Sequence, residues 1–151
     1  MSSLDALNIC ASGMTAQRVR MDTIAQNIAN VNTTRDENGN VLRRKTVLFQ
    51  TKSQDSFSRM MAMSQQNNAS DLIGNGVRVT AIVEDHVTPL RRVYEPGHPD
   101  ADEDGYVTQP NINTVTEMTN LIDASRAYEA NITAFNATKN MLLKGLEVGK
   151  G

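Results

Sequence analysis

The sequence predicts a mainly α-helical protein with a small β-rich insert. Long N- and C-terminal helices are expected to pair as a coiled-coil-like element, and the insert is expected to hold short antiparallel strands and loops. Three observations predict this class: apolar residues recur at every seventh position near both ends, the middle alternates as strands do, and only 4% of residues are aromatic. A repeat of seven keeps side chains on one seam only when a helix packs almost along another helix. The two ends are therefore expected to pack together.

The first helix is expected from Ser3 to about Asn32. Ser2 or Ser3 stands in the N-cap position ahead of Asp5, and the Asn and Thr residues of segment 30–34 favour a helix end. A helix that faces an ordinary core shows the same spacing, so the stripe alone indicates assembly without establishing it. The expected packing seam of this helix consists of Leu7, Met14, Met21, Ile24, Ile28 and Val31, with Cys10 beside it.

The insert begins with a turn and a strand. Asn38-Gly39 favours a hairpin turn because both residues tolerate positive φ. A strand is expected over Val41–Thr51. Residues 52–75 lack periodicity and are expected to form a flexible, Met-rich loop, with a short helix around 57–63 as an alternative.

The rest of the insert alternates as strands do. Residues 77–83 alternate apolar and polar, and residues 87–94 continue in the same way around Pro89, so we expect one antiparallel sheet of three or four strands. Asn113 or Thr114 then caps a second helix that runs to about residue 146. We expect three parts: the N-terminal helix of an axial core (1–34), the insert (35–110) and the C-terminal helix of the core (111–151). The expected seam of the second helix is Met118, Leu121, Tyr128, Ile132, Phe135, Leu142 and Leu146.

Composition excludes several classes of protein. The formal net charge is -2 with a pI near 5.6, and the densest basic stretch, 43–45, is expected to be a solvated strand edge, so no nucleic-acid partner is expected. Cys10 is the only cysteine, which excludes an intrachain disulfide and a Cys-based metal cluster. No stretch approaches the roughly 20 apolar residues of a membrane span, and no cleavable secretory signal is expected.

An acidic segment is the sharpest chemical candidate. Asp100, Asp102 and Asp104 followed by Gly105 resemble the opening of a calcium loop, but the twelfth position is Asn111 rather than Glu. A polar turn whose Asp side chains accept backbone hydrogen bonds is favoured, with weak surface cation binding as the alternative. The two histidines lack the spacing of a zinc site, and no nucleophile has a partner base. We expect no enzyme, no catalytic residue, no cofactor and no bound metal.

Several motifs in order along the chain resemble one family. Residues 26–33, with Asn27, Ala29, Asn30 and Thr33, resemble the N-terminal signature of the bacterial flagellar axial proteins, the rod and hook family. Segments 43–50, 93–99, 105–113 and 117–131 extend the resemblance over nearly the whole chain. Residues 33–36 replace the Thr-Gly-Tyr-Lys continuation of many hook and distal-rod relatives, so the match is closest to the proximal rod proteins.

The resemblance implies a structural subunit of the flagellar basal-body rod, stacking helically to form the drive shaft that transmits torque from motor to hook. It implies type III export without a cleavable signal, a place in the basal body, periplasmic if the host has two membranes, and no membrane span of its own. The implied partners are copies of itself, other rod proteins, the flagellar export apparatus and the motor base. A soluble coiled-coil adaptor or export chaperone is the alternative function.

Asn27 and Asn30 lie three residues apart where the first helix is expected to end. We expect their side-chain amides either to cap exposed backbone groups or to bond a neighbouring subunit.

Overall fold

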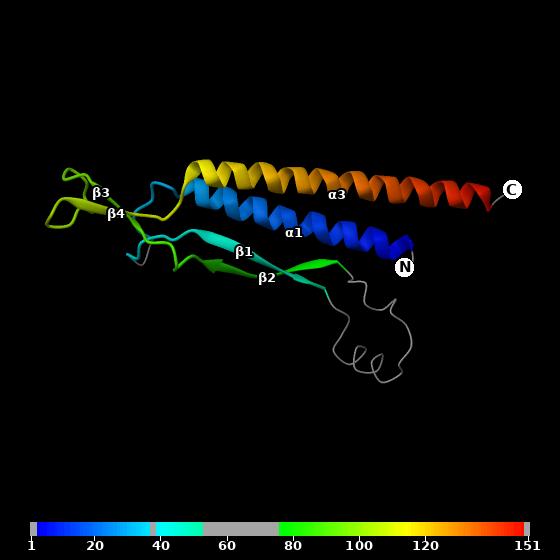
Figure 1. Ribbon diagram of the computed structural model, residues 1–151, viewed down its shortest axis with the longest axis horizontal. Helices are drawn as coiled ribbons and strands as arrows, with labels where there is room; N and C mark the ends of the chain where they lie inside the picture. The colour runs from blue at the N-terminus through cyan, green and yellow to red at the C-terminus, as the bar shows by residue number, and fades with distance from the viewer. Residues whose placement is uncertain (1–2, 37–38, 53–75, 150–151) are drawn as a thin grey trace, which may run out of the picture. The chain divides into compact units, whose positions relative to one another are not determined.

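The computed structural model describes residues 3–36, 39–52 and 76–149, and Figure 1 shows their elements. The helices are α1 (Ser3–Ala29) and α3 (Thr114–Val148). The strands are β1 (Lys45–Thr51), β2 (Val77–Glu84), β3 (Arg91–Tyr94) and β4 (Tyr106–Gln109). Two long helices with a small part of short antiparallel strands confirm the predicted fold class. Ser2, Asn38, the expected helix at 57–63 and nearly all of the expected loop 52–75 lie outside the described residues.

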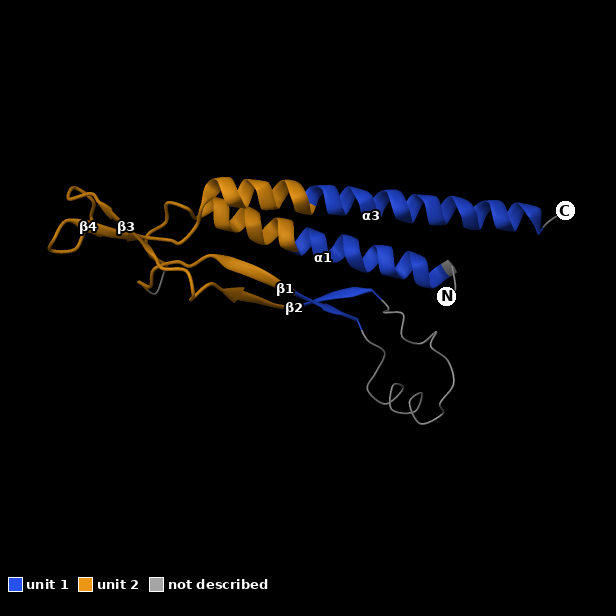
Figure 2. Ribbon diagram, in the orientation of Figure 1, with its two compact units in different colours: residues 1–19, 49–80, 125–151 blue, residues 20–48, 81–124 orange. Residues whose placement is uncertain are grey.

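The chain divides into two compact units, which Figure 2 colours separately. Unit 1 comprises residues 1–19, 49–80 and 125–151, and unit 2 comprises residues 20–48 and 81–124. Each unit contains a part of both helices and a part of both β1 and β2.

Polar side chains and turns set the ends of both helices. The α1 helix ends at Ala29, three residues before the expected end, because the chain continues as tight turns in which Val31 N–H donates to Ile28 O (3.3 Å) and Thr33 N–H to Asn30 O (3.1 Å). The α3 helix is capped by Asn113, whose Oδ1 accepts the N–H groups of Val115 (3.0 Å) and Thr116 (3.2 Å). The predicted Asn113 cap is confirmed.

The strands form two sheets of two strands, so the prediction of one sheet with three or four strands is wrong. Strands β1 and β2 are antiparallel: Lys52 N–H donates to Gly76 O (2.7 Å) near one end, and Asp85 N–H to Arg44 O (2.8 Å) near the other. In the second sheet, β3 pairs antiparallel with β4. The break comes after β2, where Asp85 Oδ1 accepts the N–H groups of Val87 and Thr88 and turns the chain out of the first sheet.

The first strand also starts later than expected. It begins at Lys45 instead of Val41, since Arg44 N–H donates to the Asn111 side chain (2.8 Å) and not to a neighbouring strand. Further upstream a turn is closed by Gly39 N–H, which donates to Asp36 O (3.0 Å), and by Asp36 N–H, which donates to Asn40 O (2.9 Å). Gly39 has a φ of 81°, the left-handed conformation that the sequence predicted for this turn.

Each unit buries its own contacts between the helices. In unit 2 the buried apolar side chains are Ile24, Val47, Val107, Ile112 and Ala124. In unit 1, Ala16 is buried, and Gly13 of α1 lies so close to Asn131 of α3 that a Cβ on Gly13 would be 2.7 Å from Asn131 Oδ1. Small residues on α1 thus allow the helices to approach.

Candidate subunit-packing site

A buried polar cluster in unit 2 joins α1, β1 and α3. Asn27, 3% exposed, donates from Nδ2 to Lys45 O (2.8 Å) and to Glu117 Oε2 (2.9 Å), while its Oδ1 accepts Lys45 N–H (2.9 Å). The amide therefore satisfies both backbone groups of the first residue of β1, as a neighbouring strand would. We call Asn27, Arg44, Asn111 and Glu117 the Asn27 cluster.

Glu117 is the buried charge of the Asn27 cluster. Its side chain is 0% exposed, and Oε1 accepts a hydrogen bond from Arg44 Nε at 2.8 Å while Oε2 accepts from Asn27. Both oxygens are satisfied, as burial of a carboxylate requires, and the first turn of a helix favours a negative charge. Arg44 is only 27% exposed, so the prediction that it lies on a solvated strand edge is wrong.

Asn111 connects the cluster to the segment after β2. Its Oδ1 accepts Arg44 N–H (2.8 Å), and its Nδ2 donates to Asp85 O (3.0 Å) and Thr88 O (3.1 Å). Arg43 Nη1 donates to the same Asp85 oxygen at 3.2 Å. The cluster thus fixes the end of α1, the start of β1 and the start of α3 within one unit, which is a structural task rather than a chemical one.

The other signature residues lie outside this cluster. Asn30 donates from Nδ2 to Gln26 O (2.9 Å) on the exposed side of α1, and Thr33 Oγ1 donates to Asn30 Oδ1 at 3.4 Å. Ala29 is exposed. The Asn27 amide therefore bonds β1 and α3 of its own chain, and the Asn30 amide bonds the backbone oxygen of Gln26. A bond from either amide to a neighbouring subunit stays a prediction.

The acidic segment forms the predicted polar turn. Asp102 Oδ1 accepts Tyr106 N–H (2.7 Å), and Asp102 Oδ2 pairs with Arg92 Nη2 at 2.6 Å. The Tyr106 N–H bond, together with the Arg92 side chain, holds the pKa of Asp102 below its ordinary value. Asp100 instead accepts from Thr34 Oγ1 (2.5 Å) and pairs with Arg35 (3.3 Å). Across the described residues, no group of three or more His, Cys, Asp or Glu side chains is arranged to hold a metal ion.

The seam residues of α3 separate into two rows. Leu121 in unit 2 is half-buried, as are Tyr128, Phe135 and Leu142 in unit 1. Next to these residues lies a row that is not part of the predicted seam and that we call the inner row. Its members are buried or half-buried: Glu117, Ala124, Asn131 and Thr138. Met118 (55% exposed), Ile132 (36%) and Leu146 (66%) stand on an exposed row instead.

The seam residues of α1 are all at least partly covered. Ile24 is 5% exposed. The remaining seam residues are half-buried: Leu7 and Met14 in unit 1, and Met21, Ile28 and Val31 in unit 2. Cys10 is a half-buried free thiol.

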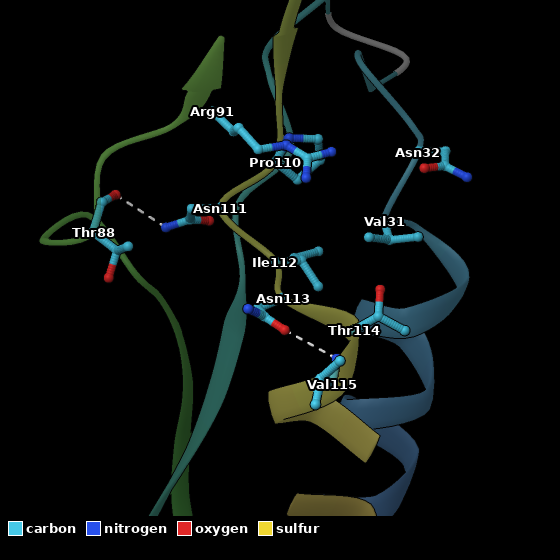
Figure 3. Close-up of a pocket in the computed structure, with 10 residues that line it drawn as sticks. All are labelled: Val31, Asn32, Thr88, Arg91, Pro110, Asn111, Ile112, Asn113, Thr114 and Val115. Atoms are coloured by element: carbon cyan, nitrogen blue, oxygen red, sulfur yellow. Dashed lines mark hydrogen bonds between the residues drawn. The ribbon is translucent and has the colours of Figure 1, made fainter. Parts of the chain in front are cut away.

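A groove of about 540 Å³ lies in unit 2 beside the start of α3 (Figure 3). Asn113 and Val115 on its wall form the capping bond drawn in the figure, and Asn111 bonds Thr88. The lining residues are Val31, Asn32, Thr88, Arg91 and residues 110–115.

Sequence reasoning about sites did not single out the residues that carry most of this site. From the sequence, Arg44 is expected on a solvated strand edge and Asn111 is the twelfth position of an incomplete calcium loop. Glu117 appears only within a motif segment, because a periodicity argument places charged side chains on the solvent face. For Glu117 the sequence does contain a signal, which is its spacing from buried residues of the same helix. Steps of four, three and four lead from Glu117 to Leu121, Ala124 and Tyr128, so Glu117 lies on the covered side of the helix.

Comparison with known proteins assigns both ends of the chain to flagellar rod families. Residues 7–35 match the family described as "Flagella basal body rod protein", and residues 103–148 match "Flagellar basal body rod FlgEFG protein C-terminal". Both matches assign the chain to the class of flagellar basal-body rod proteins. In the described part of the chain, neither helix is sufficiently long and apolar to cross a membrane.

Relatives over the full length narrow the class to one family. The chain is 46% identical to "Flagellar basal-body rod protein FlgC" of Bacillus subtilis (strain 168), over 99% of this chain and 100% of the relative. It is 39% identical to the protein of that name from Borreliella burgdorferi (100% and 100%) and 37% identical to that of Escherichia coli O6:H1 (99% and 100%). The chain belongs to the FlgC family of flagellar basal-body rod proteins, which confirms the resemblance to the flagellar rod proteins.

Proposed function

We propose that this structural subunit of the flagellar basal-body rod stacks helically along the rod axis and transmits torque from motor to hook. In the proposal, residues 1–34 and 111–151 form the axial core, and residues 35–110 form an insert on its outside. The role is structural and involves no catalysis. The FlgC relatives are named as rod proteins, which favours this role over a coiled-coil adaptor or export chaperone.

An exposed apolar row on α3 carries the proposal. In unit 2, Val115 (74% exposed), Met118 (55%) and Ile122 (54%) stand three and four residues apart. In unit 1, Ile132, Leu143 and Leu146 continue the same repeat of seven, with Leu146 66% exposed. A large apolar side chain gains about 1.5 to 3 kcal/mol when it is fully buried, and exposed apolar surface of this kind marks an interaction site.

The repeat of seven indicates what covers this row. Side chains spaced alternately three and four apart pack best against another helix that runs nearly parallel to their own. Each unit already uses the inner row of α3 for its own α1, as the Gly13–Asn131 and Asn27–Glu117 contacts indicate. The outer row is therefore left for helices of neighbouring subunits.

The proposal extends to partners and location. The partners are copies of this chain and other rod proteins, with the export apparatus and motor base at the proximal end. The subunit reaches the basal body by flagellar type III export, and it lies in the periplasm if the host has two membranes.

A substitution on the outer row tests the proposal. Met118→Glu should block incorporation into basal bodies and abolish swimming in soft agar, because a charge would be buried between subunits. Thr116→Glu, which adds the same charge to an exposed position on another side of α3, is the matched control and should swim normally. Normal swimming and incorporation of the Met118→Glu protein would show that the outer row contacts no neighbour.

A further inference from the structure

The end of the β3–β4 ribbon exposes two tyrosine and two acidic side chains. Tyr94 is 62% exposed and Tyr106 is 40% exposed, with ring centroids 5.3 Å apart in an edge-to-face arrangement. Glu103 and Asp104 are exposed beside them, and among the described residues neither carboxylate has a hydrogen bond or ion pair. We call Tyr94, Glu103, Asp104 and Tyr106 the ribbon tip. Exposed tyrosine side chains are typical anchors of protein interfaces.

The tip is held in shape by its own contacts. Arg92 pairs with Asp102 at 2.6 Å and lies 5.1 Å from the centroid of the Tyr106 ring. Gly105 turns the chain at a φ of 79°, close against the Tyr94 ring. A preformed tip loses little conformational freedom on binding, so its exposed rings and carboxylates are ready for a partner.

The groove beside the start of α3 has the complementary character. Val31 and Val115 are the accessible apolar residues of its lining, whereas Pro110 and Ile112 are buried, and the Arg91 side chain is exposed. Arg91 is the only charged residue among those that line the groove. Arg91 Nη2 donates to Gln109 Oε1, which leaves its other guanidinium N–H groups available to a carboxylate. A groove of mixed apolar and polar lining with one cation suits a tyrosine ring, which carries a polar hydroxyl, accompanied by an acid.

The tip of a given chain does not fill the groove of that chain. Arg91 pairs with Gln109 at the base of the ribbon, whereas Tyr94 pairs with Tyr106 at its far end. Three residues of strand span about 10 Å, so the ribbon carries the tip away from the groove at its base. Figure 2 shows the ribbon at the end of unit 2 opposite to the helices.

We propose that the groove binds the ribbon tip of a second copy of this chain, with Glu103 and Asp104 of one copy facing Arg91 of the next. This inference rests on the proposed function, because it names a lateral contact between rod subunits. A contact between two different surfaces is heterologous, so it continues from copy to copy into a ring or a helix, as a rod requires.

A disulfide that can form only between copies tests the contact. Two tagged forms are co-expressed in a Cys10→Ser background, one carrying Asn32→Cys in the groove and the other carrying Asp104→Cys in the tip. The expected result is a disulfide-linked heterodimer in purified basal bodies, absent from the pair Asn32→Cys with Lys144→Cys. If both forms enter basal bodies and no heterodimer forms, the inference is overturned. If neither form, nor the wild-type chain, enters basal bodies, the proposed function itself fails.

Charge reversal gives an independent readout. Arg91→Glu alone and the pair Glu103→Lys with Asp104→Lys should each reduce swimming diameter at least fivefold. The three substitutions combined should restore it to within twofold of wild type. Unchanged swimming of the Arg91→Glu strain would overturn the inference, and so would full swimming of the tip variant while Arg91→Glu swims poorly, because another protein would then occupy the groove.

Discussion

Replacing Glu117 by Gln tests the role of the buried carboxylate without changing its shape. Two donors converge on this side chain: Arg44 Nε on Oε1 at 2.8 Å and Asn27 Nδ2 on Oε2 at 2.9 Å. A carboxylate accepts both, whereas Gln presents an N–H group to one of them in either orientation. Asn27 is unable to compensate by rotating its amide, because its Oδ1 and Nδ2 already bond the N–H and O of Lys45.

The size of the effect follows from these contacts. One hydrogen bond to a charged group is worth about 1.5 to 3 kcal/mol, and two opposed donors leave one buried polar group unsatisfied. Because Arg44 is 27% exposed and water reaches part of it, we expect Glu117→Gln to lower the free energy of unfolding by about 2 kcal/mol. Urea denaturation of the purified chain, followed by circular dichroism, measures this difference. Glu129→Gln, an exposed position on the same helix, is the control and should change stability by less than about 0.5 kcal/mol. Equal stability of the two variants would refute the reasoning.

The other predictions concern α1, the packing of the helices and the acidic turn. Asn27→Leu should abolish rod assembly because it breaks three buried hydrogen bonds, whereas Asn30→Leu, which loses only local bonds, should keep most motility; equal motility of the two strains would contradict this. Gly13→Ala should lower the melting temperature, because the new Cβ would lie 2.7 Å from Asn131 Oδ1. Gly145→Ala, whose new Cβ would have no atom within 4 Å, should leave the melting temperature unchanged or raise it, since alanine favours the helix over glycine by up to about 1 kcal/mol. Asp102 has a lowered pKa in the folded chain, so its contribution to stability is present above its ordinary value of 3.8 and is lost as pH falls through the lower folded value; the stability difference between Asp102→Asn and wild type should therefore be largest at neutral pH and shrink as the pH is lowered below 3.8 in thermal unfolding scans.

The helices could be predicted from the sequence because their signals are local. A repeat of seven and an Asn cap depend only on nearby residues, and both helices lie within a few residues of the predicted bounds. Strands β1, β2 and β3 could be located in the same way, although β1 and β3 begin later than expected, but β4 was not predicted and the strand partners could not be. Pairing of β1 with β2 and of β3 with β4 depends on the Asp85 turn and on Asn111, which bonds segments 23 residues or more away.

The candidate site was predicted only in part for the same reason. Asn27 was singled out from its place in the signature, but its partners Lys45 and Glu117 stand 18 and 90 residues away along the chain. The exposed position of Met118 and the buried position of Glu117 differ by one helical residue, or about 100° around the axis. This difference of one position separates the row of α3 that contacts its own chain from the row that is exposed.

Electron cryomicroscopy of purified basal bodies tests the central claim of a helically stacked rod subunit most directly. The account predicts density for α1 and α3 of this chain along the rod axis, with Met118, Ile122 and Leu146 of the outer row against helices of neighbouring subunits. Rod density in which this chain is absent, or in which the outer row faces solvent, would contradict it.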